Sequence, residues 1–314
     1  MRADPVKGAR PIRFTSTRSK PMSPPPSRRP LLGIGLMLLG IFMFAVNDVL
    51  GKWLVGTYSV GQLLLLRSIA ALLVLLPLLG RLGGGSVRAW PHPRLQLLRI
   101  VFSTLEVVAF YWAVVFLPLA DVMTFYLAAP IYVVCLAVLF LGERLDRSQM
   151  IATALGFLGV LVALNPSSAT LTGPALIAVG GSLCFAALMI TTRGLRGTSD
   201  GILVLGQTVG ALAFGLVAAP FGWVTPSAVD FVLLSLLGVV AMGAHVCVNR
   251  SLKLAPASIV APYQYTLILW AAVFGYFVFG DLLQARTLVG ALLIIGSGLY
   301  LASQSRDSSG AKAA

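Results

Sequence analysis

Charged residues are scarce in this chain. Only 11% of its 314 residues are Asp, Glu, Lys or Arg, whereas about a quarter of an average soluble domain is charged. Hydrophobic residues make up 58% of the chain, and the mean hydropathy is +0.93. They occur in runs of roughly 17 to 24 residues, the length that a helix needs to cross a hydrocarbon core of about 30 Å. This composition excludes a soluble globular domain and predicts an all-α integral membrane protein.

The residue types that build catalytic and metal sites are also rare. The chain has two histidines, which lie far apart, and three cysteines, which occur singly in apolar runs. It contains no HExxH motif and no GxxxxGK[ST] loop for nucleotide phosphates. We therefore predict no catalytic residue, no metal site and no cofactor, and we expect that the protein is not an enzyme. A membrane-embedded enzyme would need clustered acid–base or ligand residues.

Acidic residues are fewer than basic ones, 10 against 23, which gives a net charge of +13. Eight of the basic residues lie in residues 1–29, a stretch rich in Pro and Ser. Such a segment buries too little apolar surface to fold, so we predict a disordered basic tail. No aromatic and basic stripe accompanies it, and we predict no nucleic-acid partner.

Ten segments are predicted to span the membrane. They are residues 31–53, 59–79, 96–117, 119–141, 148–164, 173–192, 201–219, 228–249, 256–279 and 286–303. With a cytoplasmic amino terminus, the inside segments hold twenty Lys and Arg residues and the outside loops hold two. The positive-inside rule therefore places both tails, 1–29 and 304–314, in the cytoplasm. This count assigns Arg99, Arg193 and the loop 250–255 to the inside segments.

The chain repeats part of itself. Residues 116–145 read FLPLADVMTFYLAAPIYVVCLAVLFLGERL, and they align at an offset of 138 with LAPASIVAPYQYTLILWAAVFGYFVFGDLL. Pro118 aligns with Pro256, and Glu143 aligns with Asp281. The two acids follow glycine at predicted helix ends, so we expect them to stabilise connections rather than to bind a substrate.

Each half of the chain holds five predicted spans, which is an odd number. The second half must therefore enter the membrane upside down relative to the first. We predict two inverted five-helix repeats, at residues 31–165 and 173–303. Inverted repeats are typical of secondary transporters, whose sites lie near the bilayer midplane between the repeats.

Ionisable residues inside a span are costly and are therefore functional candidates. Arg67 and Glu106 lie near the middle of the second and third spans, and Asp48 lies beside Asn47 near the end of the first. Arg67 could receive a substrate carboxylate or phosphate, and Glu106 could meet a cation or carry a proton. The alternatives are a structural ion pair between Arg67 and Glu106, and pairing of Asp48 with Lys52.

Neutral polar residues take these places in the second half. Gln207 corresponds to Arg67 at an offset of 140. The motif APYQY adds three candidates, Tyr263, Gln264 and Tyr265. Pro262 within this motif interrupts the helix, as Pro130 does in the first half. The tyrosines could stack on a planar or cationic group, or could pack between helices.

The segment AAPIYVVCLAVLFLGERLDRSQ (128–149) and its second copy (261–290) resemble the drug/metabolite transporter superfamily, in proteins with paired EamA-like domains. Two further stretches, AVNDVLGKWL (45–54) and APYQY (261–265), resemble the branch that includes bacterial S-adenosylmethionine uptake transporters. In the second stretch Gln264 stands where that branch has arginine.

This resemblance implies a secondary-active transporter of a small organic metabolite in the bacterial inner membrane, working by alternating access. S-adenosylmethionine or a related nucleoside or cationic metabolite is one expected substrate. Export of amino acids or drugs and uptake of a vitamin such as a flavin are alternatives, and a non-transporting scaffold is an alternative of another class. The expected partners are the small-molecule substrate and the lipid bilayer, and a homodimer is left open.

Overall fold

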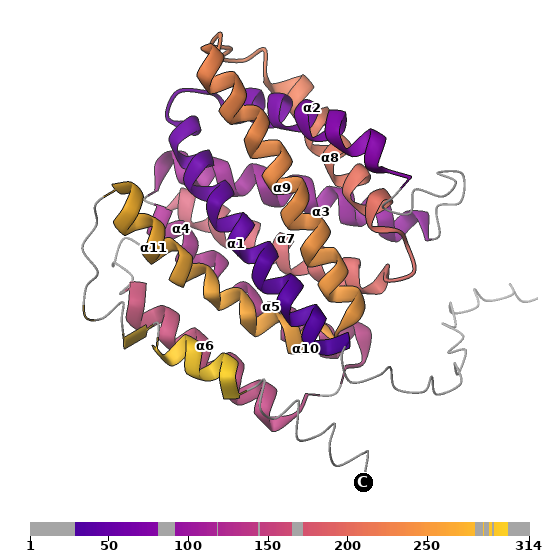
Figure 1. Ribbon diagram of the computed structural model, residues 1–314, viewed down its shortest axis with the longest axis vertical. Coiled ribbons are helices and arrows are strands. Elements are labelled where there is room, and N and C mark those ends of the chain that lie inside the picture. The colour runs from indigo at the N-terminus through magenta and orange to yellow at the C-terminus, as the bar shows by residue number, and fades with distance from the viewer. Residues whose placement is uncertain are drawn as a thin grey trace, which may run out of the picture.

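A computed structural model describes residues 29–80, 92–117, 119–143, 145–164, 172–279, 285, 289–290 and 292–300, and these residues form helices and no strand (Figure 1). The bounded elements are α1 (Arg29–Val55), α2 (Val60–Leu78), α3 (Pro93–Phe116), α4 (Leu119–Tyr126), α5 (Ala129–Leu141), α6 (Arg147–Leu164), α7 (Gly173–Gly194), α8 (Asp200–Ala218), α9 (Ala228–Leu254), α10 (Ala257–Val260), the 3₁₀ helix η1 (Ala261–Thr266) and α11 (Leu267–Phe279). Arg29, which the sequence assigns to the tail, begins α1.

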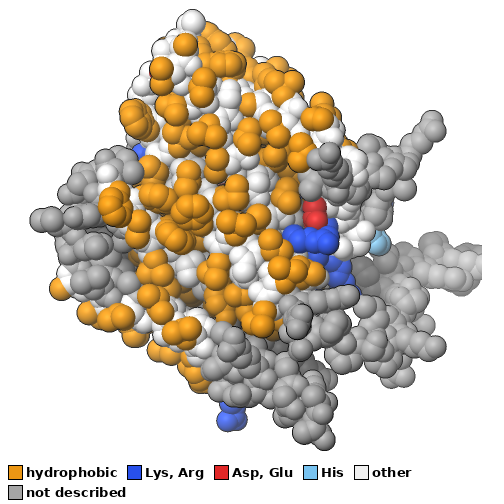
Figure 2. Space-filling view, in the orientation of Figure 1, with side chains coloured by type: hydrophobic (Ala, Val, Ile, Leu, Met, Phe, Trp, Pro, Cys, Tyr) orange, Lys and Arg blue, Asp and Glu red, His pale blue; other side chains and the backbone are white. Residues whose placement is uncertain are grey.

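Six of these helices are long and apolar enough to cross a membrane: α1, α2, α3, α7, α8 and α9. Their outward faces carry large exposed apolar side chains, such as Leu73, Val217 and Leu176. Hydrophobic side chains are spread over the whole described face in Figure 2, and the few charged groups lie toward its edge. Such a surface suits lipid rather than water. The prediction of an all-helical membrane protein is confirmed.

Two predicted spans are broken in their middle. Residues 119–141 form α4 and α5, which are separated at Leu127 and Ala128, and the proline of this break, Pro130, lies in the first turn of α5. Residues 256–279 form α10, η1 and α11, and Pro262 lies in the first turn of η1. Proline has no N–H to donate to the preceding turn, so each break follows from its proline. The predicted interruptions at both prolines are confirmed.

Helices from the two halves pair in a reciprocal way. In Figure 1, α1 runs beside α9, α3 beside α7, and α2 beside α8. By position in the two predicted repeats, α1 corresponds to α7, α2 to α8 and α3 to α9. Exchanging the halves therefore converts the α1–α9 pair into the α7–α3 pair and leaves the α2–α8 pair unchanged. The caps of α2 and α8 also correspond: Ser59 and Ser199 each accept a hydrogen bond from the backbone N–H three residues later.

Several basic residues that the sequence assigns to inside loops lie within helices. Arg99 lies in α3 and is almost completely buried, and Arg193 lies in the last turn of α7. The predicted loop 250–255 is mostly the end of α9, which continues to Leu254. Helix α9 continues beyond the apolar run because a basic side chain such as Lys253 is stabilised at a helix carboxyl terminus.

Glu143 joins the end of α5 to the start of α10. Gly142 caps α5 in the left-handed conformation, with φ of 62°, which favours glycine. The Glu143 carboxylate then accepts hydrogen bonds from Arg193 Nε (3.3 Å), the backbone N–H groups of Ala257 (3.3 Å) and Ser258 (3.2 Å), and Ser258 Oγ (2.9 Å). It therefore stabilises a connection between the halves, as expected from the sequence. Asp281, its counterpart, lies outside the described residues.

Replacing Glu143 by glutamine is expected to lower the thermal stability of the purified protein. The change leaves the Arg193 guanidinium, with a side chain only 13% exposed, without its negative partner. Loss of such charge-assisted bonds costs about 1.5–3 kcal/mol. Thermal unfolding in detergent measures the effect, and Asp146→Asn, which changes an exposed acid nearby, is the control. Equal melting temperatures for the two variants would show that the contacts of the Glu143 carboxylate have no stabilising role.

Candidate functional site

A cavity lies between α1, α2, α3, α4, α7, α9, η1 and the start of α11, and we call it the aromatic cavity. Its aromatic lining consists of Phe44, Phe110, Tyr111, Tyr126 and Phe185. Its polar lining consists of Asn47, Asp48, Arg67, Glu106, His245 and Gln264. Five of the eight residues that the sequence selects as a site therefore meet here, although they come from four separate segments of the chain. Of its polar lining, only His245 was not selected from the sequence.

Tyr111 holds two of these residues in place. Its hydroxyl oxygen accepts hydrogen bonds from Arg67 Nη1 (3.0 Å) and from Asn47 Nδ2 (3.1 Å). The Arg67 guanidinium carbon also lies 5.6 Å from the centroid of the Tyr111 ring, within the range of a cation–π contact. The sequence did not reveal Tyr111, because an aromatic residue in an apolar span is more often a packing residue.

The charged groups of the aromatic cavity are not paired with one another. Among the described residues, ion pairs join Glu143 to Arg193 and Asp200 to both Arg250 and Lys253. Neither Arg67 with Glu106 nor Asp48 with Lys52 forms one, so the structure contradicts both of the structural alternatives.

Asn47 carries an unused acceptor. Its side chain is buried, and Oδ1 has no hydrogen-bond partner among the described residues. The Nδ2 group of the same amide donates to Tyr111 and to Asp48 Oδ1 (3.3 Å). A buried acceptor without a partner is costly, and this one belongs to a residue that lines the cavity. It is suited to a donor group on a ligand.

A second cavity lies between α2, α3, α8 and α9, and we call it the polar cavity. Its polar lining consists of Arg67, Ser68, Ser103, Glu106, Gln207, Thr208 and His245. Arg67, Glu106 and His245 belong to both cavities and form the wall between them. The predicted site residue Gln207 therefore lies near the others, but on the opposite side of this wall.

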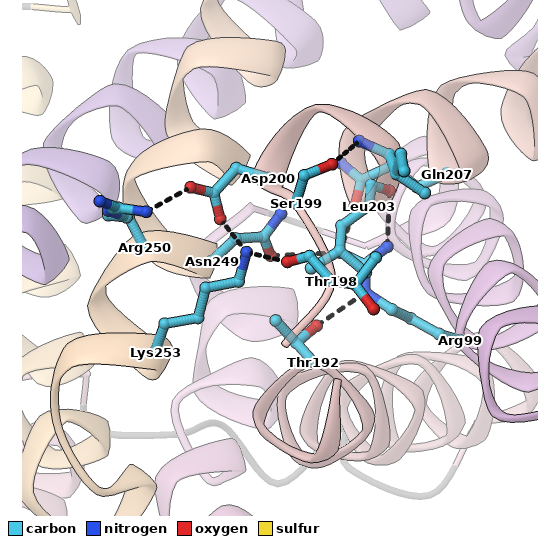
Figure 3. Close-up of polar contacts among 11 residues, drawn as sticks. Arg99, Thr192, Thr198, Ser199, Asp200, Leu203, Gln207, Asn249, Arg250 and Lys253 are labelled. Carbon is cyan, nitrogen blue, oxygen red and sulfur yellow. Dashed lines mark hydrogen bonds and ion pairs between the residues drawn. The ribbon is translucent and has the colours of Figure 1, made fainter. Parts of the chain in front are cut away.

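Gln207 is held by a buried arginine that the sequence analysis missed (Figure 3). Arg99 is 1% exposed, and its Nη2 donates to Gln207 Oε1 (2.9 Å) and Asn249 Oδ1 (3.1 Å). Its Nε donates to Thr192 Oγ1 (2.8 Å), and its Nη1 donates to the Leu203 carbonyl (2.8 Å). These are neutral acceptors, so the guanidinium is stabilised by hydrogen bonds and not by an ion pair with another described residue. Its position near the start of a predicted span made it resemble an interfacial arginine.

An ion-pair cluster lies beside Arg99 (Figure 3). Asp200, the first residue of α8, pairs with Lys253 and with Arg250, whose Nη1 lies 3.3 Å from Asp200 Oδ2. Lys253 also donates to the carbonyl of Thr198. Together with Arg99, this cluster joins α3, the end of α7, the start of α8 and the end of α9.

Tyr263 and Tyr265 line neither cavity. The Tyr263 hydroxyl donates to the Gly298 carbonyl (3.2 Å), and the fully buried Tyr265 packs against α6 at Gly156. The tight turn of η1 directs Gln264 toward the aromatic cavity and places the neighbouring tyrosines in packing contacts. Their geometry fits the packing alternative, not stacking on a ligand.

A family model described as the EamA-like transporter family matches residues 31–165 and 172–303. An uncharacterized transporter of Helicobacter pylori is 30% identical to this chain, and the match covers 87% of this chain and 95% of the relative. The S-adenosylmethionine uptake transporter of Rickettsia felis is 26% identical over 86% of this chain and 92% of its own length. The riboflavin transporter of Rhizobium johnstonii is 26% identical over 88% and 92%.

A solved crystal structure superposes on this one with a TM-score of 0.73. The superposition covers 90% of this chain and 98% of the solved chain, at 15% sequence identity. This likeness concerns the fold, because the identity is too low to carry a function.

Proposed function

Because this chain belongs to the EamA-like transporter family, we propose that it is a secondary-active transporter that carries a small organic cation across the bacterial inner membrane. S-adenosylmethionine is the first substrate to test, since a relative that takes it up aligns along most of the chain. The observation that carries the proposal is that Asp48, Glu106 and Arg67 line one aromatic cavity without pairing to each other.

The preference for a cation follows from the balance of groups in the aromatic cavity. Two carboxylates, Asp48 and Glu106, accompany the single guanidinium of Arg67. An ionisable group in the membrane interior is expensive unless it has a partner, and a cationic ligand supplies that partner. Aromatic faces also attract cations, most strongly where water is excluded. The unused Asn47 Oδ1 offers an acceptor to an amino or amide donor of the same ligand.

We further propose that the chain forms ten spans in two inverted repeats, 31–165 and 173–303, with both tails in the cytoplasm. The reciprocal pairing of α1 with α9 and of α3 with α7 supports this arrangement. So does the occurrence of a broken helix at the same place in each half. The two cavities lie between helices of both halves, so rocking of one repeat against the other gives alternating access. The tail residues 1–28 and 304–314 lie outside the described residues.

The experiment that tests the proposed function combines a binding screen with flux. Thermal-shift measurements on the purified protein compare cationic nucleosides, amino acids, flavins and amines, and the stabilising compounds are then followed into proteoliposomes. We expect S-adenosylmethionine or another organic cation to stabilise the protein and to be transported with saturable kinetics. Stabilisation by flavins alone would replace this proposal with vitamin uptake, and binding without flux would favour a non-transporting role.

Asp48→Asn is expected to weaken binding and uptake of the cationic substrate by about 10- to 100-fold. The substitution keeps the size of the side chain but removes one of the two carboxylates, and a hydrogen bond to a charged group is worth about 1.5–3 kcal/mol. Initial uptake rates over a range of substrate concentrations measure the effect. Asp146→Asn, at an exposed position, serves as the matched control. Unchanged saturation and unchanged pH dependence in Asp48→Asn would remove this residue from the site.

A further inference from the structure

We propose that the polar cavity is a second subsite, which receives the carboxylate of a substrate whose cationic part occupies the aromatic cavity. The inference rests on the proposed function and narrows the substrate class to amino-acid-like cations, which carry a positive group and a carboxylate on one molecule. The two cavities adjoin, hydroxyl and amide donors line the polar cavity, and one guanidinium lies where the two cavities meet.

The two cavities are close enough to serve one ligand. Arg67, Glu106 and His245 line both of them, so the two cavities adjoin at these side chains. The Arg67 guanidinium donates one N–H to the Tyr111 hydroxyl. Its other N–H groups remain available to a carboxylate. A ligand that binds Arg67 can therefore contact the Asp48 and Glu106 carboxylates in the aromatic cavity and the polar side chains of the polar cavity.

Two buried serines present hydroxyl donors to the polar cavity. Ser68 on α2 and Ser103 on α3 are both more than nine-tenths buried and line the cavity. The nearby Thr208 hydroxyl donates to the Val204 carbonyl within its own helix. Buried polar groups in native proteins are normally satisfied. The two serines therefore suit a ligand with acceptor atoms.

Gln207 adds a third donor because Arg99 fixes its orientation. Arg99 Nη2 donates to Gln207 Oε1 at 2.9 Å (Figure 3), so the amide oxygen is occupied. The amide nitrogen, Nε2, is then the group of this side chain that is left to donate, and Gln207 lines the polar cavity. Arg99 is thus a positioning residue, which turns the donor side of this amide toward the ligand.

The charge of the site favours a carboxylate over a phosphate. Among the described residues that line the two cavities, Arg67 is the only Lys or Arg, and Glu106 lines both cavities beside it. One guanidinium can balance the single charge of a carboxylate in a bidentate pair. A phosphate, with nearly two charges, would face Glu106 with too little positive charge to offset the repulsion.

Equilibrium binding to the purified full chain tests the inference with two pairs of probes. Each pair contains an amino-acid-like cation and its decarboxylated analogue: S-adenosylmethionine with decarboxylated S-adenosylmethionine, and arginine with agmatine. We expect the carboxylate-bearing member of the pair that binds to bind at least about tenfold more tightly. We expect the double variant Ser68→Ala/Ser103→Ala to lose most of this advantage and to bind the decarboxylated member as the unmodified chain does.

Ser235→Ala, which removes a hydroxyl on α9 that donates to the Phe231 carbonyl, is the matched control and should keep the full advantage. Equal affinity for both members of a pair in the unmodified chain would overturn the inference while leaving cation transport intact. Equal weakening of both members in the double variant would also overturn it. If none of the four cations binds, the inference fails, and the proposed function is then decided by the wider screen of organic cations.

Discussion

Replacing Arg67 by alanine is expected to lower uptake at least about 100-fold, while the protein still reaches the membrane in normal amount. Arg67 lines both cavities and holds no ion pair among the described residues, so its charge is available to the substrate. Removing one partner of a buried charged pair typically costs about 2–5 kcal/mol, and about 2.7 kcal/mol corresponds to 100-fold. Initial uptake rates in proteoliposomes, normalised to the reconstituted protein, measure the loss.

Two further variants separate the role of the charge from that of the geometry. Arg67→Lys keeps the positive charge but loses the planar fork and the bidentate geometry, so we expect it to recover only part of the uptake. Arg94→Ala, at an exposed position early in α3, should transport normally. Full uptake by Arg67→Ala would reduce this arginine to a structural residue and would remove the main support for the proposed site.

Gly238→Ala is expected to destabilise the protein and to abolish most transport. A Cβ at this position of α9 would overlap the carbonyl group and Cα of Arg67 in α2. These are backbone atoms, which cannot rotate away, so the two helices would have to separate. Overpacking of this kind costs about 1–3 kcal/mol. Separation would also displace Arg67 from both cavities. Thermal unfolding and uptake of the same preparation measure the two effects.

Gly180→Ala is the matched control for this change. Gly180 lies in α7, and a Cβ there would meet no atom within 4 Å. The alanine should be tolerated, and its better helix propensity, worth up to about 1 kcal/mol, should not lower stability. If Gly238→Ala melts and transports like Gly180→Ala, the close contact between α2 and α9 is not required to position the arginine.

The sequence predicts the charged part of the candidate site better than its neutral part. Arg67, Glu106 and Asp48 are recognisable because a charge inside an apolar span needs a reason. Tyr111, Ser68 and Ser103 give no such signal, since aromatic and hydroxyl residues are common in membrane helices. Their importance depends on which helices face each other, and that information is tertiary.

The boundaries of the elements show a similar division. Proline predicts the interruptions in 119–141 and 256–279, because the lost hydrogen bond is a local effect. The direction in which η1 turns its side chains is not local, and Tyr263 and Tyr265 therefore lie in packing contacts instead of the cavity. Arg99 was counted among the inside basic residues for a related reason: its neutral acceptors come from α7, α8 and α9.

The phenol of Tyr111 mechanically links three helices through one oxygen atom. Its hydroxyl holds Arg67 of α2 and Asn47 of α1, and the ring itself belongs to α3. Any ligand that draws the Arg67 guanidinium toward itself competes with the Tyr111 hydroxyl for the same N–H. The contact that restrains the Asn47 amide on α1 changes with it. A ligand bound as proposed would therefore loosen the contacts of α1, α2 and α3 with one another at a single oxygen atom.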